Sequence, residues 1–160
     1  MRKIMITAAL LGGSAPFGAS ASEDISGTYR LVVDQRRIVD TGETITGKTP
    51  LGYITYGKEG RMMVIIVRHP RPKPAVADKF TDEERVGLHR TMSAYGGTYM
   101  FDGKTVRHNV DIAWNEVWSG ITQERAVTRE GDRLTLTTPP YRNQTDGKTS
   151  VNILVWEKVK

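Results

Sequence analysis

Short runs of β-branched and aromatic residues, separated by turn residues at intervals of about ten positions, dominate the second half of this chain. Turns are indicated at Asp102-Gly103 and at Glu130-Gly131-Asp132, and Pro139-Pro140 ends another run. Strands of this length joined by short turns are typical of an antiparallel sandwich or barrel. The sequence therefore predicts a mainly β fold of one of these two kinds.

The first half of the chain carries the same kind of strand signal. Residues 28–33 form one run, and residues 52–56 and 61–68 are predicted to form a hairpin across the turn at 58–60. The run 62–67 is apolar at every position. We therefore expect both faces of its strand to be covered, one by the domain interior and the other by a helix or loop.

A proline-rich connector and one helix interrupt the strands. Prolines at every second position in residues 69–74 favour an extended segment, either a solvated connector or a lid or partner-binding edge. Thr81 and Glu84 form a capping-box pattern, which predicts a helix over about residues 81–95. The apolar residues expected on one face of this helix are Leu88, Met92 and Tyr95.

Residues 1–21 are typical of a secretory signal. Arg2 and Lys3 precede a short apolar run, and Ala19-Ser20-Ala21 matches a small-x-small cleavage site. A frayed helix or a retained anchor is the alternative. We expect a domain at residues 22–160 that is periplasmic or secreted, with no later segment apolar enough to span a membrane.

Composition excludes several functional classes. The chain has no cysteine, so disulfides, thiol nucleophiles and cysteine-ligated metals are ruled out. Removing residues 1–21 takes two of the 23 basic residues and leaves 21 against 18 acidic ones, a net charge of only +3. No basic stripe is present, so a nucleic-acid partner is not expected. The three histidines lack ligand spacing, and neither a metal nor a cofactor is predicted.

Strand parity divides the polar residues of the predicted strand 105–114 into two sets. Val106, His108, Val110, Ile112 and Trp114 share one face; Arg107, Asn109, Asp111 and Ala113 share the other. His108 is then placed inside an apolar interior, where desolvation favours the neutral imidazole. It is either a core histidine satisfied by one neighbour or a functional group. Asp111 is expected on the solvated face and is excluded as its partner.

The next predicted strand, over residues 117–129, adds further candidates after a turn near Asn115-Glu116. Gln123 and Arg125 share one face of it. The guanidinium of Arg125 is either an anchor for a ligand carboxylate or phosphate, or a structural group at the barrel end. Trp118 near the turn is expected to line a pocket mouth.

An ordered set of motifs extends over nearly all of residues 22–160. They include Gly27-Thr28-Tyr29-Arg30-Leu31-Val32, Tyr95-x-Gly97-Thr98-Tyr99, Val106-x-His108-x-Val110, Trp118-x-Gly120-x-x-Gln123-x-Arg125 and Leu154-Val155-Trp156-Glu157. This set resembles the lipocalin-like domain proteins of bacteria and fungi. The resemblance implies a mainly β, calycin-type antiparallel barrel of about eight to ten strands around a central cavity. Tyr29 replaces the tryptophan of the lipocalin G-x-W motif, so the carriage of fatty acids or retinoids is not implied.

These observations favour a barrel that binds a small hydrophobic or amphipathic molecule, including an anionic one, as a monomer or small homo-oligomer. The expected ligand contacts are Tyr56, Tyr99, His108, Trp118, Gln123 and Arg125. The alternative is a cofactor-independent isomerase, cyclase or hydratase with His108 as general base. A third possibility is an interaction module that uses the proline-rich connector. No G-x-S-x-G, P-loop or H-E-x-x-H motif is present.

Overall fold

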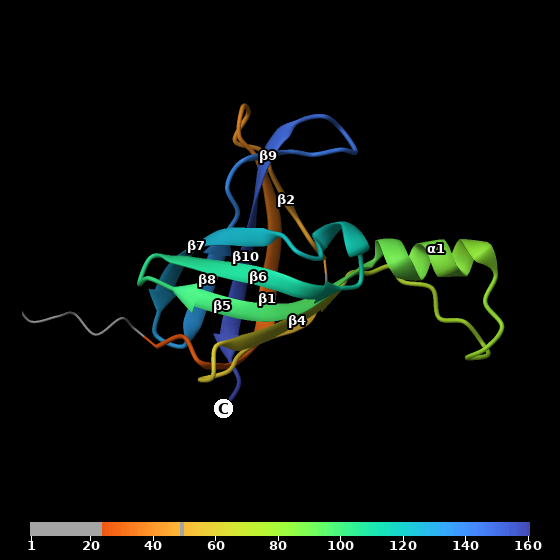
Figure 1. The fold of residues 1–160 in the computed structure, drawn as a ribbon. Coiled ribbons are helices and arrows are strands. Elements are labelled where there is room, and N and C mark those ends of the chain that lie inside the picture. Colours follow the sequence, from red (N-terminus) through yellow and green to blue (C-terminus); the bar gives the residue numbers. More distant parts are fainter. Residues whose placement is uncertain (1–23, 49) are drawn as a thin grey trace, which may run out of the picture.

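Eight antiparallel strands close into a barrel in the computed structural model, which describes residues 24–48 and 50–160 (Figure 1). The predicted signal, residues 1–21, lies outside the described residues. The barrel strands, in spatial order, are β1 (Gly27–Ile38), β3 (Leu51–Tyr56), β4 (Arg61–Val67), β5 (Met92–Phe101), β6 (Thr105–Ala113), β7 (Thr122–Glu130), β8 (Arg133–Thr137) and β10 (Thr149–Lys158). The lipocalin-like barrel predicted from the sequence is confirmed.

The barrel closes where the first strand meets the last. β1 pairs with β10 from Tyr29 opposite Lys158 to Ile38 opposite Ser150. Two short strands, β2 (Thr44–Thr46) and β9 (Tyr141–Arg142), extend the sheet beside β1 and β10. Closure leaves none of the eight barrel strands as a free edge.

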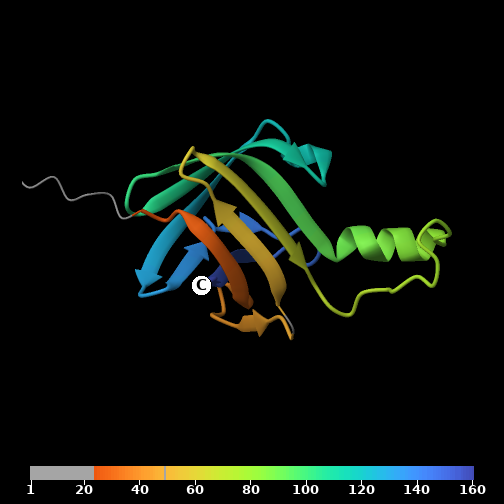
Figure 2. The ribbon, with the colours of Figure 1, turned by 90° about the horizontal axis from the view of Figure 1, so that it is seen from below.

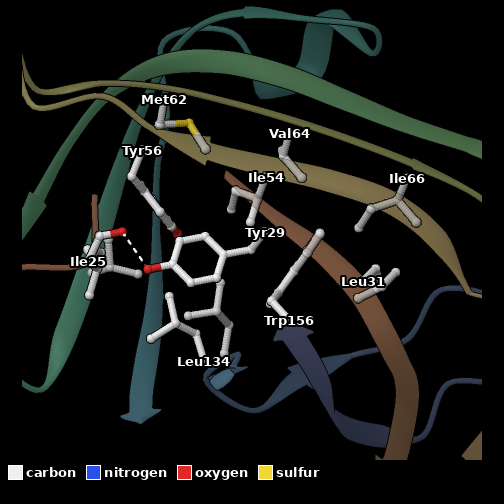
Figure 3. Close-up of a cluster of buried hydrophobic side chains, with 12 residues drawn as sticks. Ile25, Tyr29, Leu31, Ile54, Tyr56, Met62, Val64, Ile66, Leu134 and Trp156 are labelled. Carbon is white, nitrogen blue, oxygen red and sulfur yellow. Dashed lines mark hydrogen bonds between the residues drawn. The ribbon is translucent and has the colours of Figure 1, made fainter. Parts of the chain in front are cut away.

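The hydrophobic core fills one end of the barrel. Side chains of β3 and β4 alternate strictly between buried and exposed, as expected for strands with one face inside. Figure 3 shows Met62, Val64 and Ile66 pointing from β4 towards Tyr29 and Trp156. The Tyr29 hydroxyl donates a 3.0 Å hydrogen bond to the Ile25 carbonyl oxygen, which fixes the chain entering β1 across this end. Side chains therefore fill the interior of the barrel at this end.

Within residues 24–48 and 50–160, no element covers the outer face of β4, so the expectation that both its faces are covered is wrong. Met63 is 69% exposed and Ile65 is 47% exposed. Tyr53 on β3 and Ile112 on β6 are also exposed. The apolar run 62–67 reflects a packed inner face and an apolar patch on the outside.

The helix α1 (Asp82–Arg90) is shorter than the predicted 81–95. Its capping box is present, with the Thr81 hydroxyl accepting from the Glu84 amide and the Glu84 carboxylate accepting from the Thr81 amide. Met92 and Tyr95 belong instead to β5, which pairs with both β4 and β6. The spacings of four and three residues between Leu88, Met92 and Tyr95 fit one face of a helix, which explains the error; in a strand, Met92 and Tyr95 lie on opposite faces because they are three residues apart.

The segment that carries α1 extends away from the barrel, between the end of β4 and the start of β5 (Figures 1 and 2). None of the helical residues is buried. No helix among residues 24–48 and 50–160 has the length and apolarity needed to cross a bilayer.

A β-bulge changes the predicted parity of β6. Gly97 of β5 pairs with Val110, whereas the preceding Gly96 pairs with Ile112, so Asp111 is the extra residue. Ile112, expected inside, is 66% exposed. The predicted turn at 115–116 is a 3₁₀ helix, η1 (Glu116–Trp118), and β7 begins at Thr122 rather than at residue 117.

Candidate ligand-binding site

A cavity of about 590 Å³ lies in the barrel beyond its packed end, and several residues of the hydrophobic core form part of its wall. Its apolar wall consists of Ile54, Val64, Ile66, Leu136, Leu154 and Trp156. Its polar wall includes Arg68, Ser93, Tyr95, His108, Gln123 and Arg125. Ile121 at the rim is 43% exposed and Pro139 and Pro140 are exposed, so the cavity opens at this end. The volume lies within the range that drug-sized ligands occupy.

His108 is held between two tyrosines at the boundary between the core and the cavity. Its Nε2 is 2.8 Å from the Tyr56 hydroxyl, and its Nδ1 is 2.9 Å from the Tyr95 hydroxyl. The imidazole is only 1% exposed. Asp111 is exposed and forms a bidentate ion pair with Arg61 outside the barrel, so the exclusion of Asp111 as a partner of His108 is confirmed.

The environment of His108 keeps the imidazole neutral. Burial, followed by the nearby positive charge of Arg125, lowers the His108 pKa from 6.5 to about 3. Burial also raises the pKa values of Tyr56 and Tyr95, although Arg125 acts in the opposite direction on both phenols. All three groups are therefore uncharged at neutral pH and interact as hydrogen-bonding dipoles.

Gln123 and Arg125 lie on the strand next to His108. Gln123 is directly opposite His108 in the β6–β7 register, and Arg125 is opposite Val106. One Arg125 nitrogen, Nη2, donates a 2.5 Å hydrogen bond to Oε1 of Gln123, and Nη1 donates to the Glu124 carbonyl oxygen. The parity of β7 thus brings both predicted side chains to the cavity wall.

Two of the predicted ligand contacts lie elsewhere. Tyr56 is 1% exposed, stands behind His108, and does not line this cavity. Tyr99 does not line it either, and its hydroxyl donates to the Gly57 carbonyl oxygen at 3.0 Å. The two rings pack edge to face with centroids 4.7 Å apart. They support the base of the site rather than its wall.

Sequence reasoning missed Tyr95, as well as Arg68 and Ser93, among the polar residues of the cavity wall. The assignment of Tyr95 to the helix concealed its place on β5, where Tyr95, Gly97 and Tyr99 share the inward face. The signal was present in the motif Tyr95-x-Gly97-Thr98-Tyr99, because residues at every second position share a strand face.

Aromatic rings connect the cavity mouth with the helical segment. Trp118 lines the cavity and contacts the Tyr95 ring edge to face, with centroids 5.8 Å apart. Trp114 packs against Trp118 at 5.0 Å, and His89 of α1 lies over Trp114 at 4.8 Å. Trp118 is consequently fixed in position at the rim by rings on either side.

A second, smaller hollow of about 360 Å³ lies on the outer surface over β3 to β6. Its wall includes Tyr53, Met63, Ile65, Ile112 and Trp114. Tyr95 borders both hollows, but His108 and Arg125 belong only to the interior cavity. The outer hollow is therefore an apolar surface without the convergent polar groups of the interior.

The model of one protein family, the lipocalin-like domain, matches residues 26–159. The chain belongs to this lipocalin-like family. The matched range contains the complete barrel, from β1 to β10, and every polar residue of the cavity. No curated protein matches the chain. Membership in the lipocalin-like family agrees with a fold that encloses a small-molecule cavity, while the identity of the ligand depends on the cavity's own side chains.

The lipocalin-like barrel also places one unpaired donor beside the apolar wall. The indole Nε1 of Trp156 is buried, and it has no hydrogen-bond partner among residues 24–48 and 50–160. In the same part of the chain, no group of three or more histidine and acidic side chains is positioned to hold a metal ion.

Proposed function

We propose that this protein binds a small, partly apolar molecule in the barrel cavity. The observation that carries the proposal is the combination of an aliphatic wall with a few polar groups that converge from β5, β6 and β7. Apolar surface supplies the driving force for binding, and a small number of fixed polar groups supplies orientation. His108, Trp118, Gln123 and Arg125 contribute to the wall.

Binding is favoured over general-base catalysis by the state of His108. Both ring nitrogens already have tyrosine partners, and the lowered pKa of about 3 makes the imidazole a weak base at neutral pH. A role for the proline-rich connector as the main interaction element is less well supported, because the barrel contains a cavity and is not packed solid.

We also propose that the protein acts outside the cytoplasm, in the periplasm or after secretion. The support is the cationic start, apolar run and Ala19-Ser20-Ala21 pattern of residues 1–21. Intact-mass measurement of the exported protein should give the mass of residues 22–160. Recovery of the full 160-residue chain from the exported fraction would contradict this part of the proposal.

Binding can be tested with the neutral fluorescent probe N-phenyl-1-naphthylamine. We expect saturable binding of the probe by the purified protein. Binding should be lost in Leu154→Trp, because the larger side chain occupies cavity space beside the apolar wall. Ser93→Phe narrows the open end at a half-buried position and should also weaken binding. This second variant keeps the test valid if the first fails to fold, as judged by thermal unfolding.

The outer hollow provides the control for this experiment. Met63→Glu places a charge in that hollow at a side chain that is 69% exposed. Binding of the probe should survive this change. Loss of binding in Met63→Glu together with retention in Leu154→Trp and Ser93→Phe would overturn the cavity proposal.

A further inference from the structure

The hydrogen bonds of His108 determine which tyrosine hydroxyl proton faces the cavity. A neutral imidazole has one N–H donor and one acceptor nitrogen, so it donates to one tyrosine and accepts from the other. The two partners, Tyr56 and Tyr95, lie on Nε2 and Nδ1 respectively. Two tautomers are therefore possible, and they differ in the hydroxyl proton that is left free.

The burial of Tyr56 decides between these tautomers. Its hydroxyl has no other hydrogen-bond partner among residues 24–48 and 50–160, and the side chain is 1% exposed. If His108 donated to Tyr56, the Tyr56 proton would be buried without an acceptor, which is costly. Tyr56 therefore donates to Nε2, and the Nδ1–H of His108 donates to the Tyr95 oxygen. The Tyr95 hydroxyl proton is then free to donate into the cavity that Tyr95 lines.

Gln123 presents a second donor beside it. Its Oε1 accepts the 2.5 Å hydrogen bond from Arg125, which assigns the amide oxygen to that contact. The amide nitrogen, with two N–H groups, consequently remains available to a ligand. The Gln123 side chain thus links the Arg125 guanidinium to the cavity and adds donors of its own.

Arg125 brings the positive charge. It has no acidic partner within 4.0 Å among residues 24–48 and 50–160, whereas Arg68, the other arginine of the cavity wall, is paired with Asp34 at 2.8 Å. Arg107, on the outer face, is paired with Glu124 at 2.7 Å. Glu124 also borders the cavity, but Arg107 pairs with it on the outer face. Within the described residues, Arg125 is therefore the cation of the cavity wall that has no carboxylate partner, and it lies beside the neutral groups of Gln123 and Tyr95.

We propose that Tyr95, Gln123 and Arg125 form a binding site for a single carboxylate, so that the ligand is an apolar carboxylic acid whose body lies against the aliphatic wall. A guanidinium fork matches the geometry of a carboxylate. The single uncompensated positive charge matches a monoanion better than a phosphate dianion. This inference rests on the proposed binding function and specifies the ligand class for it.

Decanoic acid and decan-1-ol form a matched pair that tests the carboxylate site. Each is titrated against bound N-phenyl-1-naphthylamine at pH 7.5, and the apparent affinities are compared. We expect the acid to bind at least about tenfold more tightly than the alcohol, because hydrogen bonds to a charged group are the stronger ones. Equal affinities of the acid and the alcohol would overturn the carboxylate site while leaving the cavity proposal intact.

Variants separate the contributions within the site. Arg125→Gln should weaken acid binding about tenfold or more and leave alcohol binding unchanged, and Tyr95→Phe should weaken acid binding about threefold to tenfold. Arg61→Gln removes the same charge from the outer face, where Arg61 pairs with Asp111, and should leave both affinities unchanged because neither residue lines the cavity. An equal loss of acid affinity in Arg61→Gln and Arg125→Gln would show a general charge effect and overturn the site.

Imidazole ¹⁵N chemical shifts provide a readout that does not depend on affinity. We expect His108 to show a protonated Nδ1 and an unprotonated Nε2, with the Nε2 signal changed in Tyr56→Phe. The opposite tautomer would remove Tyr95 from the proposed site. Failure of the probe, the acid and the alcohol to bind at all would instead overturn the cavity function, and the carboxylate site with it.

Discussion

The phenol oxygen of Tyr56 lies 2.8 Å from Nε2 of His108, and each of the two side chains is only 1% exposed. This buried pair forms a layer between the packed end of the barrel and the open cavity. The pair stabilises the fold only when both partners are present, because a buried polar group without a hydrogen-bond partner is destabilising.

We expect Tyr56→Phe to lower the free energy of unfolding by about 1–3 kcal/mol, since it leaves Nε2 of His108 without its donor. Tyr53→Phe is the matched control on the same strand, because Tyr53 is 46% exposed on the outer face. It should change stability by less than about 0.5 kcal/mol. Urea unfolding measures both, and equal effects of the two substitutions would contradict the role given to the pair.

Stability should depend on pH through His108. The pKa of His108 is about 3 in the folded protein, compared with 6.5 for an unperturbed histidine. Below pH 6.5 the unfolded chain therefore takes up a proton that the folded chain does not. The free energy of unfolding then falls with decreasing pH, by up to about 1.4 kcal/mol per pH unit from this group. Above pH 6.5, the titration of His108 should not change the free energy of unfolding. The difference between the protein and His108→Gln, measured by urea unfolding at pH 7.5, 6 and 5, should narrow as the pH falls; a constant difference would contradict the prediction.

The two glycines at the β5–β6 bulge should differ sharply in their tolerance of a methyl group. A Cβ at Gly97 would overlap the backbone carbonyl of Asn109, whereas a Cβ at Gly96 would meet its nearest neighbour, the Met62 carbonyl oxygen, at 3.4 Å. Gly97→Ala should therefore destabilise the barrel by about 1–3 kcal/mol. Gly96→Ala should be tolerated. Thermal unfolding of the two variants in parallel provides the test.

Shortening an isoleucine side chain should destabilise the protein to different extents on the two faces of the β3–β4 hairpin. Ile54 is 1% exposed in the core, and Ile65 is 47% exposed on the outer face. We expect Ile54→Ala to cost about 2–5 kcal/mol and Ile65→Ala less than about 1 kcal/mol. Similar costs would mean that the outer face is covered in solution, and sedimentation would then show whether a second copy covers it.

Loss of the helix cap should act locally. Thr81→Ala removes the hydroxyl that accepts from the Glu84 amide, which is worth about 1 kcal/mol to a helix. Because no residue of α1 is buried, amide hydrogen exchange over 82–90 should accelerate while global unfolding stays unchanged. A matching drop in global stability would indicate that α1 is part of the cooperative unit.

Local patterns were sufficient to predict the strands, because alternation and turn residues act within a few positions of each other. Arg125 and Gln123 could be placed on one face by parity alone, and β7 confirms their shared orientation. Ile112 was misplaced because the bulge at Asp111 depends on the pairing partner, Gly96-Gly97, which is remote in sequence.

Tyr95 and the outer face of β4 show a second limit of sequence reasoning. The spacing of Met92 and Tyr95 fits one face of a helix, and only their pairing with β4 and β6 shows that both belong to a strand, on opposite faces. Exposed apolar side chains such as Met63 cannot be recognised from composition, since an apolar run looks the same whether or not its second face is covered.

The pairing of β1 with β10 makes formation of the domain depend on both of its ends. The Val159 amide donates to the Thr28 carbonyl oxygen at 2.8 Å, so the two ends of the domain meet. A growing chain that lacks residues 149–158 has β1 and β8 without their shared neighbour, and the ring of strands stays open. Completion of the barrel must therefore wait until the last strand is available to pair, and until then two unpaired strand edges are available for association with other chains.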